Sequence, residues 1–339
     1  MRAVAYRNPG PADDPRVLND IELPRPVPAR CDLLVEVRAV SVNPVDTKRR
    51  AAARPTESEW RVLGFDAAGV VVETGPNVTN FKTGDQVFYA GDITRPGTNA
   101  EFHLVDERIV GHKPSSLDWS EAAALPLTAI TAWEALFDRL DIRRPVAGAS
   151  SILIIGGAGG VGSIAVQLAR HLTDLTVIAT ASRAETRDWA RGLGAHHVLD
   201  HSRPLSEEIA AAGLDAPGFV LATTHSGAHR DEIVKLIAPQ GRFALIDDPD
   251  HFDIAPFKRK AVSVHWEAMF ARSTFATADM AEQGKLLEEV ARLVDAGTIK
   301  TTLSERFGPI SAANLRRAHM LVESGTARGK IVLEGFRAG

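Results

Sequence analysis

The pattern of hydrophobic and polar positions changes near residue 120 of this chain. Before that point, short alternating or apolar runs are separated by Pro and Gly, which predicts the strands of a β-rich domain. These predicted strands are 33–42, 69–73, 86–90 and 101–105, and the N-terminus also enters a strand.

Beyond Ser120, helices alternate with short apolar runs. Ser120 precedes a helix over 121–125, Pro126 interrupts it, and a second helix runs through Ala132 to Leu140. Six apolar runs follow, with helical segments between most of them, and this alternation predicts a doubly wound parallel sheet. The six predicted strands are 152–155, 175–180, 197–200, 218–222, 241–246 and 261–265.

This alternation ends near residue 266. A helix over 279–296, a strand over 301–307, a helix over 313–324 and a strand over 330–333 follow. Because so short a segment cannot build a good core alone, we expect it to return to the N-terminal β domain. The predicted domains are therefore 1–122 with 267–339, and 123–266.

Composition and charge narrow the class of protein. The chain has 339 residues, 45% hydrophobic and 24% charged, as in ordinary globular proteins of two domains. Its net charge of −4 and the lack of a basic run predict no nucleic acid or membrane partner. Cys31 is the single cysteine, which excludes an intrachain disulfide and favours a reducing compartment. Without an apolar signal segment, the protein is expected to be cytoplasmic.

The most informative motif is ILIIGGAGGVGSIAVQLAR, residues 152–170. An apolar strand runs into Gly157, Gly159 and Gly162 and then into an amphipathic helix, which is typical of a dinucleotide site. The first glycine is expected to permit the tight turn, and the helix N-terminus faces the phosphates. A P-loop would need Lys at Ser163. The cofactor-binding residues predicted from this loop are Gly157, Gly159, Gly160, Val161 and Gly162.

The end of the second strand indicates which dinucleotide binds. NAD-specific sites place Asp or Glu there, about 20 residues past the glycines. This chain has Ser182 and Arg183, whose hydroxyl and guanidinium suit a 2′-phosphate, so NADPH is predicted. Arg187 could add charge. The alternative is that Ser182 caps the helix over 184–193 and Arg183 is merely solvated.

Motifs along nearly the whole chain resemble the medium-chain dehydrogenase/reductase superfamily. Asn43 to Asp46 and Leu125 to Ala129 are similar to its zinc-free quinone oxidoreductase branch, and the full set resembles the group often labelled "zinc-binding alcohol dehydrogenase family protein". The resemblance implies an α/β fold with a GroES-like β-rich catalytic domain and a Rossmann NADPH-binding domain. The motifs are AVSVNPVDTKRR (39–50), VLGFDAAGVVVETG (62–75), FKTGDQVFYAGD (81–92), AAALPLTAITAWEAL (122–136), the glycine loop and ARGKIVLEGF (327–336).

Zinc-type members of this superfamily hold a catalytic ion through Cys, His and a further Cys or Asp. The matching positions here are Asn43, Phe65 and Leu127, which cannot replace thiolate and imidazole. Two other groupings, His225 with His229 and the acidic cluster over 247–253, are interpreted as surface groups, since Gly227 interrupts the first. We therefore predict no metal site and no zinc.

Loss of the Lewis acid makes alcohol oxidation improbable and favours substrates that are already electrophilic. The predicted function is hydride transfer from NADPH to quinones or related carbonyl and enone compounds. The resemblance implies a cleft with the nicotinamide over Asn43 and Asp46. Asn43 could donate a hydrogen bond or cap its turn, and Asp46 could act as an acid or cap the following helix. Tyr89 is the candidate proton donor, with packing as its alternative.

The resemblance implies four further cofactor contacts. Thr128 and Thr131 belong to the segment near the nicotinamide, or are simply helix hydroxyls. His201 matches a position where relatives place an aromatic near the 2′-phosphate. Lys330 could reach the cofactor, or be a solvated cation at the start of a strand.

Two other functions and an assembly state are also considered. The first is a nucleotide-sensing or RNA-binding relative with little turnover, and the second is a true alcohol dehydrogenase.

The segment AVSVHWEAMFAR (261–272) combines a β-rich run with Trp266, Met269 and Phe270. Because the last strand of the nucleotide domain pairs across a dimer axis in relatives, a homodimer is predicted; a protected edge within one subunit is the alternative.

Overall fold

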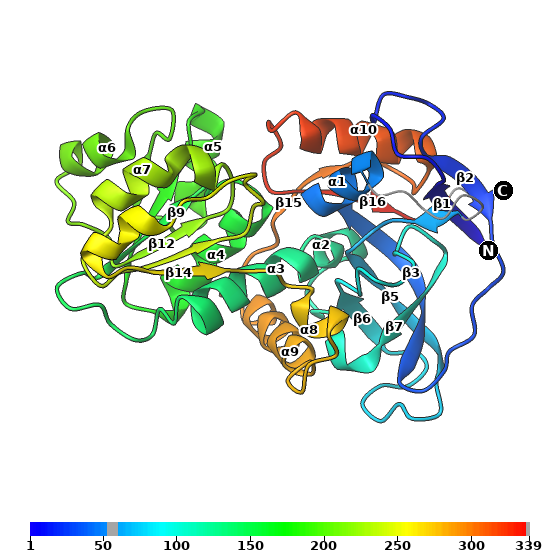
Figure 1. Cartoon of the computed structure of the whole chain (residues 1–339). Coiled ribbons are helices and arrows are strands. Elements are labelled where there is room, and N and C mark those ends of the chain that lie inside the picture. Colours follow the sequence, from blue (N-terminus) through cyan, green and yellow to red (C-terminus); the bar gives the residue numbers. More distant parts are fainter. Residues whose placement is uncertain (53–59, 337–339) are drawn as a thin grey trace. The chain divides into compact units, whose positions relative to one another are not determined.

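The computed structural model describes residues 1–52 and 60–336 of the chain (Figure 1). Its contacts divide the chain into two compact units, Met1–Leu127 with Phe270–Gly339, and Thr128–Met269. The domain boundaries predicted from the sequence lie a few residues away, after 122 and after 266.

The first unit is built on a seven-stranded sheet in which β3 is the central strand. It is rich in valine, and it pairs antiparallel with β5, β7 and β16. Pairing of β16 with β3 joins the C-terminal segment to the N-terminal strands, with Ile331 opposite Val42. The strands are β3 (Asp32–Val42), β5 (Ala67–Thr74), β6 (Gln86–Tyr89), β7 (Phe102–Asp106), β8 (Val110–His112), β15 (Leu303–Arg306) and β16 (Lys330–Glu334).

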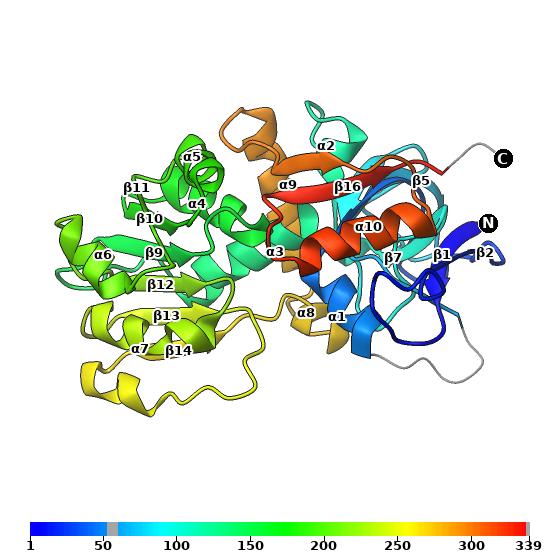
Figure 2. The same cartoon turned by 90° about the horizontal axis from the view of Figure 1, so that it is seen from above.

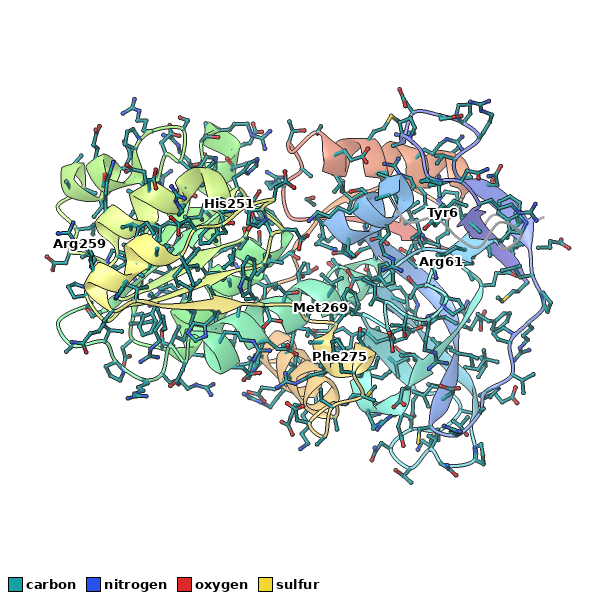
Figure 3. The ribbon with its side chains drawn as sticks, viewed as in Figure 1. Tyr6, Arg61, His251, Arg259, Met269 and Phe275 are labelled. Carbon is teal, nitrogen blue, oxygen red and sulfur yellow. The ribbon has the colours of Figure 1, made fainter. Side chains whose placement is uncertain are left out.

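A small second sheet and several helices complete this unit. The sheet has the order β2-β1-β4, formed by Asn19–Glu22, Arg2–Tyr6 and Arg61–Val62. Tyr6 lies opposite Arg61 where β1 meets β4 (Figure 3). The helices are α1 (Pro44–Ala52), a 3-10 turn (Glu107–Ile109), α2 (Trp119–Ala123), α8 (Ala271–Thr274), α9 (Glu282–Asp295) and α10 (Ala312–Glu323).

The second unit is a doubly wound sheet of six parallel strands, so the predicted α/β fold class is confirmed. Its strand order is β11-β10-β9-β12-β13-β14, and Figure 2 shows the strands side by side in that order. The strands are β9 (Ser151–Ile155), β10 (Thr176–Thr180), β11 (His197–Leu199), β12 (Phe219–Ala222), β13 (Arg242–Leu245) and β14 (Ser263–Trp266).

Helices lie before and between these parallel strands. They are α3 (Pro126–Trp133), which begins at the boundary with the first unit, a π-helical turn (Glu134–Arg139), α4 (Gly160–Leu172), α5 (Ala184–Gly192), α6 (Leu205–Ala211), α7 (Ser226–Leu236) and a 3-10 segment (Ala255–Lys260). The three isoleucines and the leucine of β9 are fully buried, since this strand lies inside the sheet with helices packed against it. No helix among residues 1–52 and 60–336 is long and apolar enough to cross a membrane.

Two differences between the structure and the predicted elements have a local physical reason. Pro126 begins α3 rather than only interrupting a helix, because proline is well suited to a first helical turn. Strands β2, β4 and β8 were not predicted; they have 4, 2 and 3 residues, too few to show a hydrophobic period.

Candidate functional site: a glycine loop and a buried polar cluster

The glycine-rich loop lies where β9 ends and α4 begins, at the carboxyl edge of the parallel sheet. Gly159 is the N-cap of α4 and has an extended backbone, and no acidic residue stands in the first turn. Free N–H groups at a helix N-terminus bind anions, and ligands of such sheets bind at this edge. The local geometry therefore suits a pyrophosphate.

The contacts around each glycine show why side chains are excluded. A Cβ on Gly157 would lie 2.7 Å from the Cβ of Ala179 on β10, and a Cβ on Gly162 would lie 2.2 Å from the carbonyl oxygen of Gly156. Gly156 itself has φ +82°. The tight turn thus belongs to Gly156, which corrects the expectation that Gly157 supplies it.

The end of β10 carries the residues predicted to recognise the 2′-phosphate. Arg183, not Ser182, is the N-cap of α5, and it makes no capping hydrogen bond through its side chain. The alternative in which Ser182 caps this helix is therefore wrong. Ser182 is exposed, and Arg183 lies 3.5 Å from Glu185 in a solvent-accessible ion pair.

Arg187 is already engaged by neighbours in the same unit. Its Nη2 lies 2.5 Å from the Asp200 carboxylate, and its Nε donates to the Ala181 carbonyl at 3.1 Å. The positive charge of Arg187 is therefore neutralised by its ion pair with Asp200 and is not available to a phosphate.

His201 follows β11 and contacts the end of β10. Its Nδ1 is 2.9 Å from the hydroxyl of Thr180, the last residue of the strand. The same hydroxyl accepts a hydrogen bond from the Gly156 N–H at 3.0 Å, so His201 is linked to the glycine loop through one side chain. Thr128 and Thr131, the other predicted cofactor contacts in this unit, are buried on α3.

In the first unit, the Asp66 carboxylate is the centre of a buried polar cluster. It accepts hydrogen bonds from Ser41 Oγ and Asn43 Nδ2 at 2.7 Å, from the Leu127 N–H at 2.7 Å, and from Lys330 Nζ at 3.0 Å. Asp66 is fully buried and Lys330 is 3% exposed. Four donors around one buried carboxylate hold this part of the site in a single arrangement.

Lys330 uses its three N–H groups inside this cluster. They point to Asp66, to the Asn43 side-chain carbonyl and to the Val42 carbonyl. The alternative of a solvated cation is wrong, because strand β16 lies beside β3 and places the ammonium group in the interior. Contact of Lys330 with a cofactor stays a prediction.

Asn43 and Asp46 are both held by hydrogen bonds within this unit. Asn43 donates through Nδ2 to Asp66 and accepts through Oδ1 from Lys330. Asp46 accepts from the backbone N–H of Asn43 at 2.8 Å and of Gly64 at 3.0 Å, which supports its capping role at the start of α1. Burial raises the pKa of the Asp46 carboxyl to about 7.

The Tyr89 hydroxyl points into the first unit's interior. It lies 3.2 Å from His103 Nδ1, while His103 Nε2 lies 2.9 Å from the Pro96 carbonyl. Because a carbonyl requires a donor, Nε2 carries the imidazole proton and Tyr89 donates to Nδ1. Burial raises the pKa of Tyr89, so the geometry favours packing over proton donation.

The three positions that match zinc ligands hold no metal-binding side chain. Asn43 is engaged as described, Phe65 packs edge-on against Phe270 with ring centroids 5.4 Å apart, and Leu127 is apolar. Across residues 1–52 and 60–336, His, Cys, Asp and Glu side chains nowhere gather in a group of three or more that could hold a metal ion. The ammonium of Lys330 beside Asn43 adds a positive charge that disfavours a divalent cation.

Comparison with known proteins identifies the family. An alcohol dehydrogenase GroES-like domain matches residues 29–115, and a zinc-binding dehydrogenase domain matches residues 193–333. A zinc-type alcohol dehydrogenase-like protein of Staphylococcus aureus is 38% identical over 336 residues, 98% of this chain and 99% of its own. The chain belongs to the medium-chain dehydrogenase/reductase superfamily, and it is an oxidoreductase of that family.

Two further relatives have different descriptions. A crystal structure of a putative zinc-dependent alcohol dehydrogenase protein from Rhizobium etli is 66% identical, with a TM-score of 0.97 over 100% of this chain and 99% of that chain. The 2-methylene-furan-3-one reductase of Solanum lycopersicum is 29% identical over 98% of this chain and 79% of its own. Family membership is thus shared by proteins named for different substrates.

Sequence reasoning missed two polar groupings. Asp66 stood in a quoted motif without a role, although an acidic residue in an apolar run signals a buried partner. Glu134 and Glu267, both buried in the second unit, share a hydrogen bond beside Arg139, whose Nε lies 2.9 Å from Glu267. No local pattern marked that pair.

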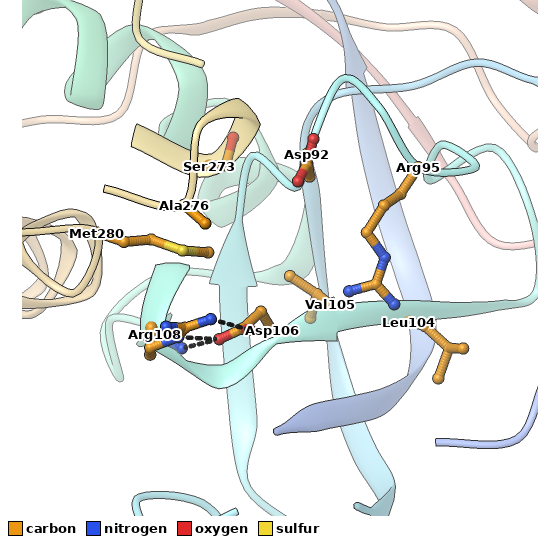
Figure 4. A pocket seen from close by; sticks show the side chains of 9 residues that line it. All are labelled: Asp92, Arg95, Leu104, Val105, Asp106, Arg108, Ser273, Ala276 and Met280. Atoms are coloured by element: carbon orange, nitrogen blue, oxygen red, sulfur yellow. Dashed lines mark hydrogen bonds and ion pairs between the residues drawn. The ribbon is translucent and has the colours of Figure 1, made fainter. Parts of the chain in front are cut away.

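The first unit also contains a pocket of about 190 Å³ between the β7 region and residues 273–280 (Figure 4). Its arginines are already neutralised, since Arg95 lies 2.8 Å from Asp32 and Arg108 lies 2.8 Å from Asp106. The pocket's arginines therefore offer no uncompensated positive charge to a ligand.

Proposed function

We propose that this protein is an NADPH-dependent, zinc-independent oxidoreductase that transfers a hydride to quinones or related electrophilic carbonyl and enone compounds. The observation that carries the proposal is the Asp66 cluster. At the position of a zinc ligand, the Asn43 amide is engaged by Asp66 on one side and by the Lys330 ammonium on the other. This arrangement supports a reaction that proceeds without a Lewis acid.

The absence of Lewis-acid assistance restricts the substrate class. A simple alcohol or aldehyde needs several kcal/mol of charge stabilisation at its oxygen, which a metal ion ordinarily supplies. A quinone or enone is already electrophilic and needs mainly orientation and a few hydrogen bonds. The name of the tomato relative, a reductase of a methylene-furanone, supports the enone part of this class.

The preference for NADPH rests on the end of β10. Ser182 and Arg183 stand where an NAD-specific site would place a carboxylate. The nearest acidic groups are compensated, since Asp200 is paired with Arg187 and Glu185 lies beside Arg183. When bound, NADPH supplies the hydride, and the loop and Arg183 supply binding and orientation.

Turnover with a chelator tests the metal-free chemistry. NADPH oxidation is measured with a small quinone, an enone and a simple aldehyde, each with and without EDTA. We expect turnover of the quinone or enone that the chelator leaves unchanged. Loss of that activity with EDTA and its return with zinc would refute the proposal.

Substitution of Arg183 tests the cofactor choice. Arg183→Glu should weaken NADPH binding at least tenfold while leaving NADH binding within about twofold, because one charge reversal near a phosphate changes the free energy by 1–2 kcal/mol or more. Arg191→Glu is the matched control, since Arg191 lies on the same helix α5 and pairs with exposed Asp188. Equal losses for both cofactors would contradict the assignment.

An alcohol dehydrogenase is the second candidate, favoured by the descriptions of the Staphylococcus and Rhizobium relatives. Metal analysis of the purified protein, followed by alcohol oxidation assays with added zinc, distinguishes the two. One zinc per chain together with alcohol turnover would replace our proposal.

We further propose a cytoplasmic homodimer joined through β14, an edge strand on which Trp266 is 53% exposed. Gel filtration with light scattering would test this assembly.

A further inference from the structure

Three histidines gather at the carboxyl edge of the second unit's sheet. The rings of His201 and His229 have centroids 6.4 Å apart. His225, at the N-cap of α7, lies close enough for its charge to act on both of them. We call these three residues the histidine cluster.

The cluster lies beside the residues that recognise the 2′-phosphate in our proposed function, on which this inference rests. His201 forms a hydrogen bond with Thr180, the last residue of β10. Ser182 and Arg183 lie two and three residues after Thr180 in the chain. Thr180 accepts from the Gly156 N–H, so its own hydrogen is available to His201 Nδ1. In the tautomer in which Thr180 donates to Nδ1, His201 carries its proton on Nε2, which can donate to an anion.

Fixed positive charge is scarce at this point. A phosphate monoester carries about −1.5 to −2 at neutral pH. Arg187 is paired with Asp200, and Arg183, the residue assigned to the phosphate, carries only a single charge beside Glu185. A bound 2′-phosphate therefore needs another source of positive charge, and imidazoles can acquire it by taking up a proton.

We propose that the histidine cluster takes up a proton when a 2′-phosphorylated dinucleotide binds, so that the preference for NADPH over NADH increases as the pH falls. The proton comes from solvent and is held on an imidazole facing the phosphate. NADH lacks the 2′-phosphate and causes no proton uptake.

The charges around the cluster agree with this behaviour. Burial lowers the pKa of His201 and of His229, so both are mainly neutral at pH 7.5 before the ligand binds. Asp200 and Arg187 also face His201, and Asp247 and Glu232 face His229. The nearby acids are engaged: Asp200 by Arg187 and Ser202, Glu232 by Lys235 and Ser206, and Asp247 by the Ser226 N–H.

Calorimetry in buffers of different ionisation enthalpy measures the proton directly. An anion close to a histidine raises its pKa by about 1–3 units, so wild-type protein should take up roughly half a proton or more per NADPH at pH 7.5. The 2′-phosphate itself has a pKa near 6, and binding among cations could only make it release protons. Net proton uptake would therefore come from the histidines, and net release from the phosphate. NADH should show no uptake.

Two variants and one control locate the proton. His201→Gln keeps a partner for Thr180 but cannot be protonated, and it should abolish most of the uptake and flatten the pH dependence of NADPH affinity between pH 7 and 8.5. His225→Asn, which tolerates the left-handed backbone at that position, should reduce the uptake partly. His171→Gln, an exposed histidine at the end of α4, should behave as wild type.

The outcomes separate this inference from the proposed function. If wild-type protein binds no NADPH, the proposed function fails. If it binds NADPH without uptake, or if uptake persists in both His201→Gln and a combined His225→Asn, His229→Gln variant, the cofactor assignment stands and the histidine inference is overturned.

Discussion

Replacement of Lys330 by Met should destabilise the first unit strongly. Lys330 is 3% exposed, and its ammonium lies 3.0 Å from fully buried Asp66. Methionine fills a similar volume but leaves the carboxylate without its cation, and it also leaves the Asn43 and Val42 carbonyls without this donor. Removing one partner of a buried ion pair costs about 3–5 kcal/mol of unfolding free energy.

Differential scanning calorimetry is the assay, because the two units can unfold in separate transitions. For a unit of this size, 1 kcal/mol corresponds to roughly 2–4 °C in Tm, so the first unit's transition should fall by about 6–20 °C. Lys285→Met is the matched control. Lys285 is 71% exposed and pairs with Glu282 at 2.7 Å on α9, an arrangement worth only about 0–1 kcal/mol.

A double-mutant cycle with Asp66→Asn completes the test. Removing both charges eliminates the uncompensated carboxylate, so the double variant should be more stable than the sum of the single losses predicts. A Tm change below about 2 °C in Lys330→Met, or strict additivity in the cycle, would refute the idea that this pair is energetically coupled.

Two further predictions follow from burial and close packing. Burial, and then the neighbouring Glu134, raise the pKa of Glu267 to about 8, so the native state binds more protons than the unfolded chain above about pH 4.5. The unfolding free energy of the second unit should therefore fall as the pH rises towards 8 and level off above pH 8. Urea unfolding of Glu267→Gln should show a weaker pH dependence. An unchanged dependence of the unfolding free energy on pH in this variant would contradict the prediction. Gly162→Ala should lower the unfolding free energy by about 1–3 kcal/mol or more, because its Cβ would lie 2.2 Å from the Gly156 carbonyl oxygen. Gly159→Ala should lower it by less than about 1 kcal/mol, because its Cβ would lie 3.5 Å from the same oxygen. Equal thermal shifts for the two glycine variants would count against the packing argument.

The catalytic candidates show where reasoning from local sequence ends. Tyr89 ends a strand, and alternation along the strand leaves its surroundings undetermined. The structure directs its hydroxyl to His103, 14 positions away in the chain. Ser182 illustrates the same limit, because a residue type that favours N-caps lies one position before the actual cap at Arg183.

The sequence by itself determined the order of strands and helices in the second unit, the glycine spacing, and the lack of a carboxylate directly after β10. Each of these is a local property, carried by hydrophobic period or by a residue's own backbone freedom. Only the tertiary structure decided that Lys330 meets Asp66, 264 positions away, and that Glu134 meets Glu267. Such pairs depend on which strands lie side by side and on what is excluded from water between them, and no local periodicity encodes either.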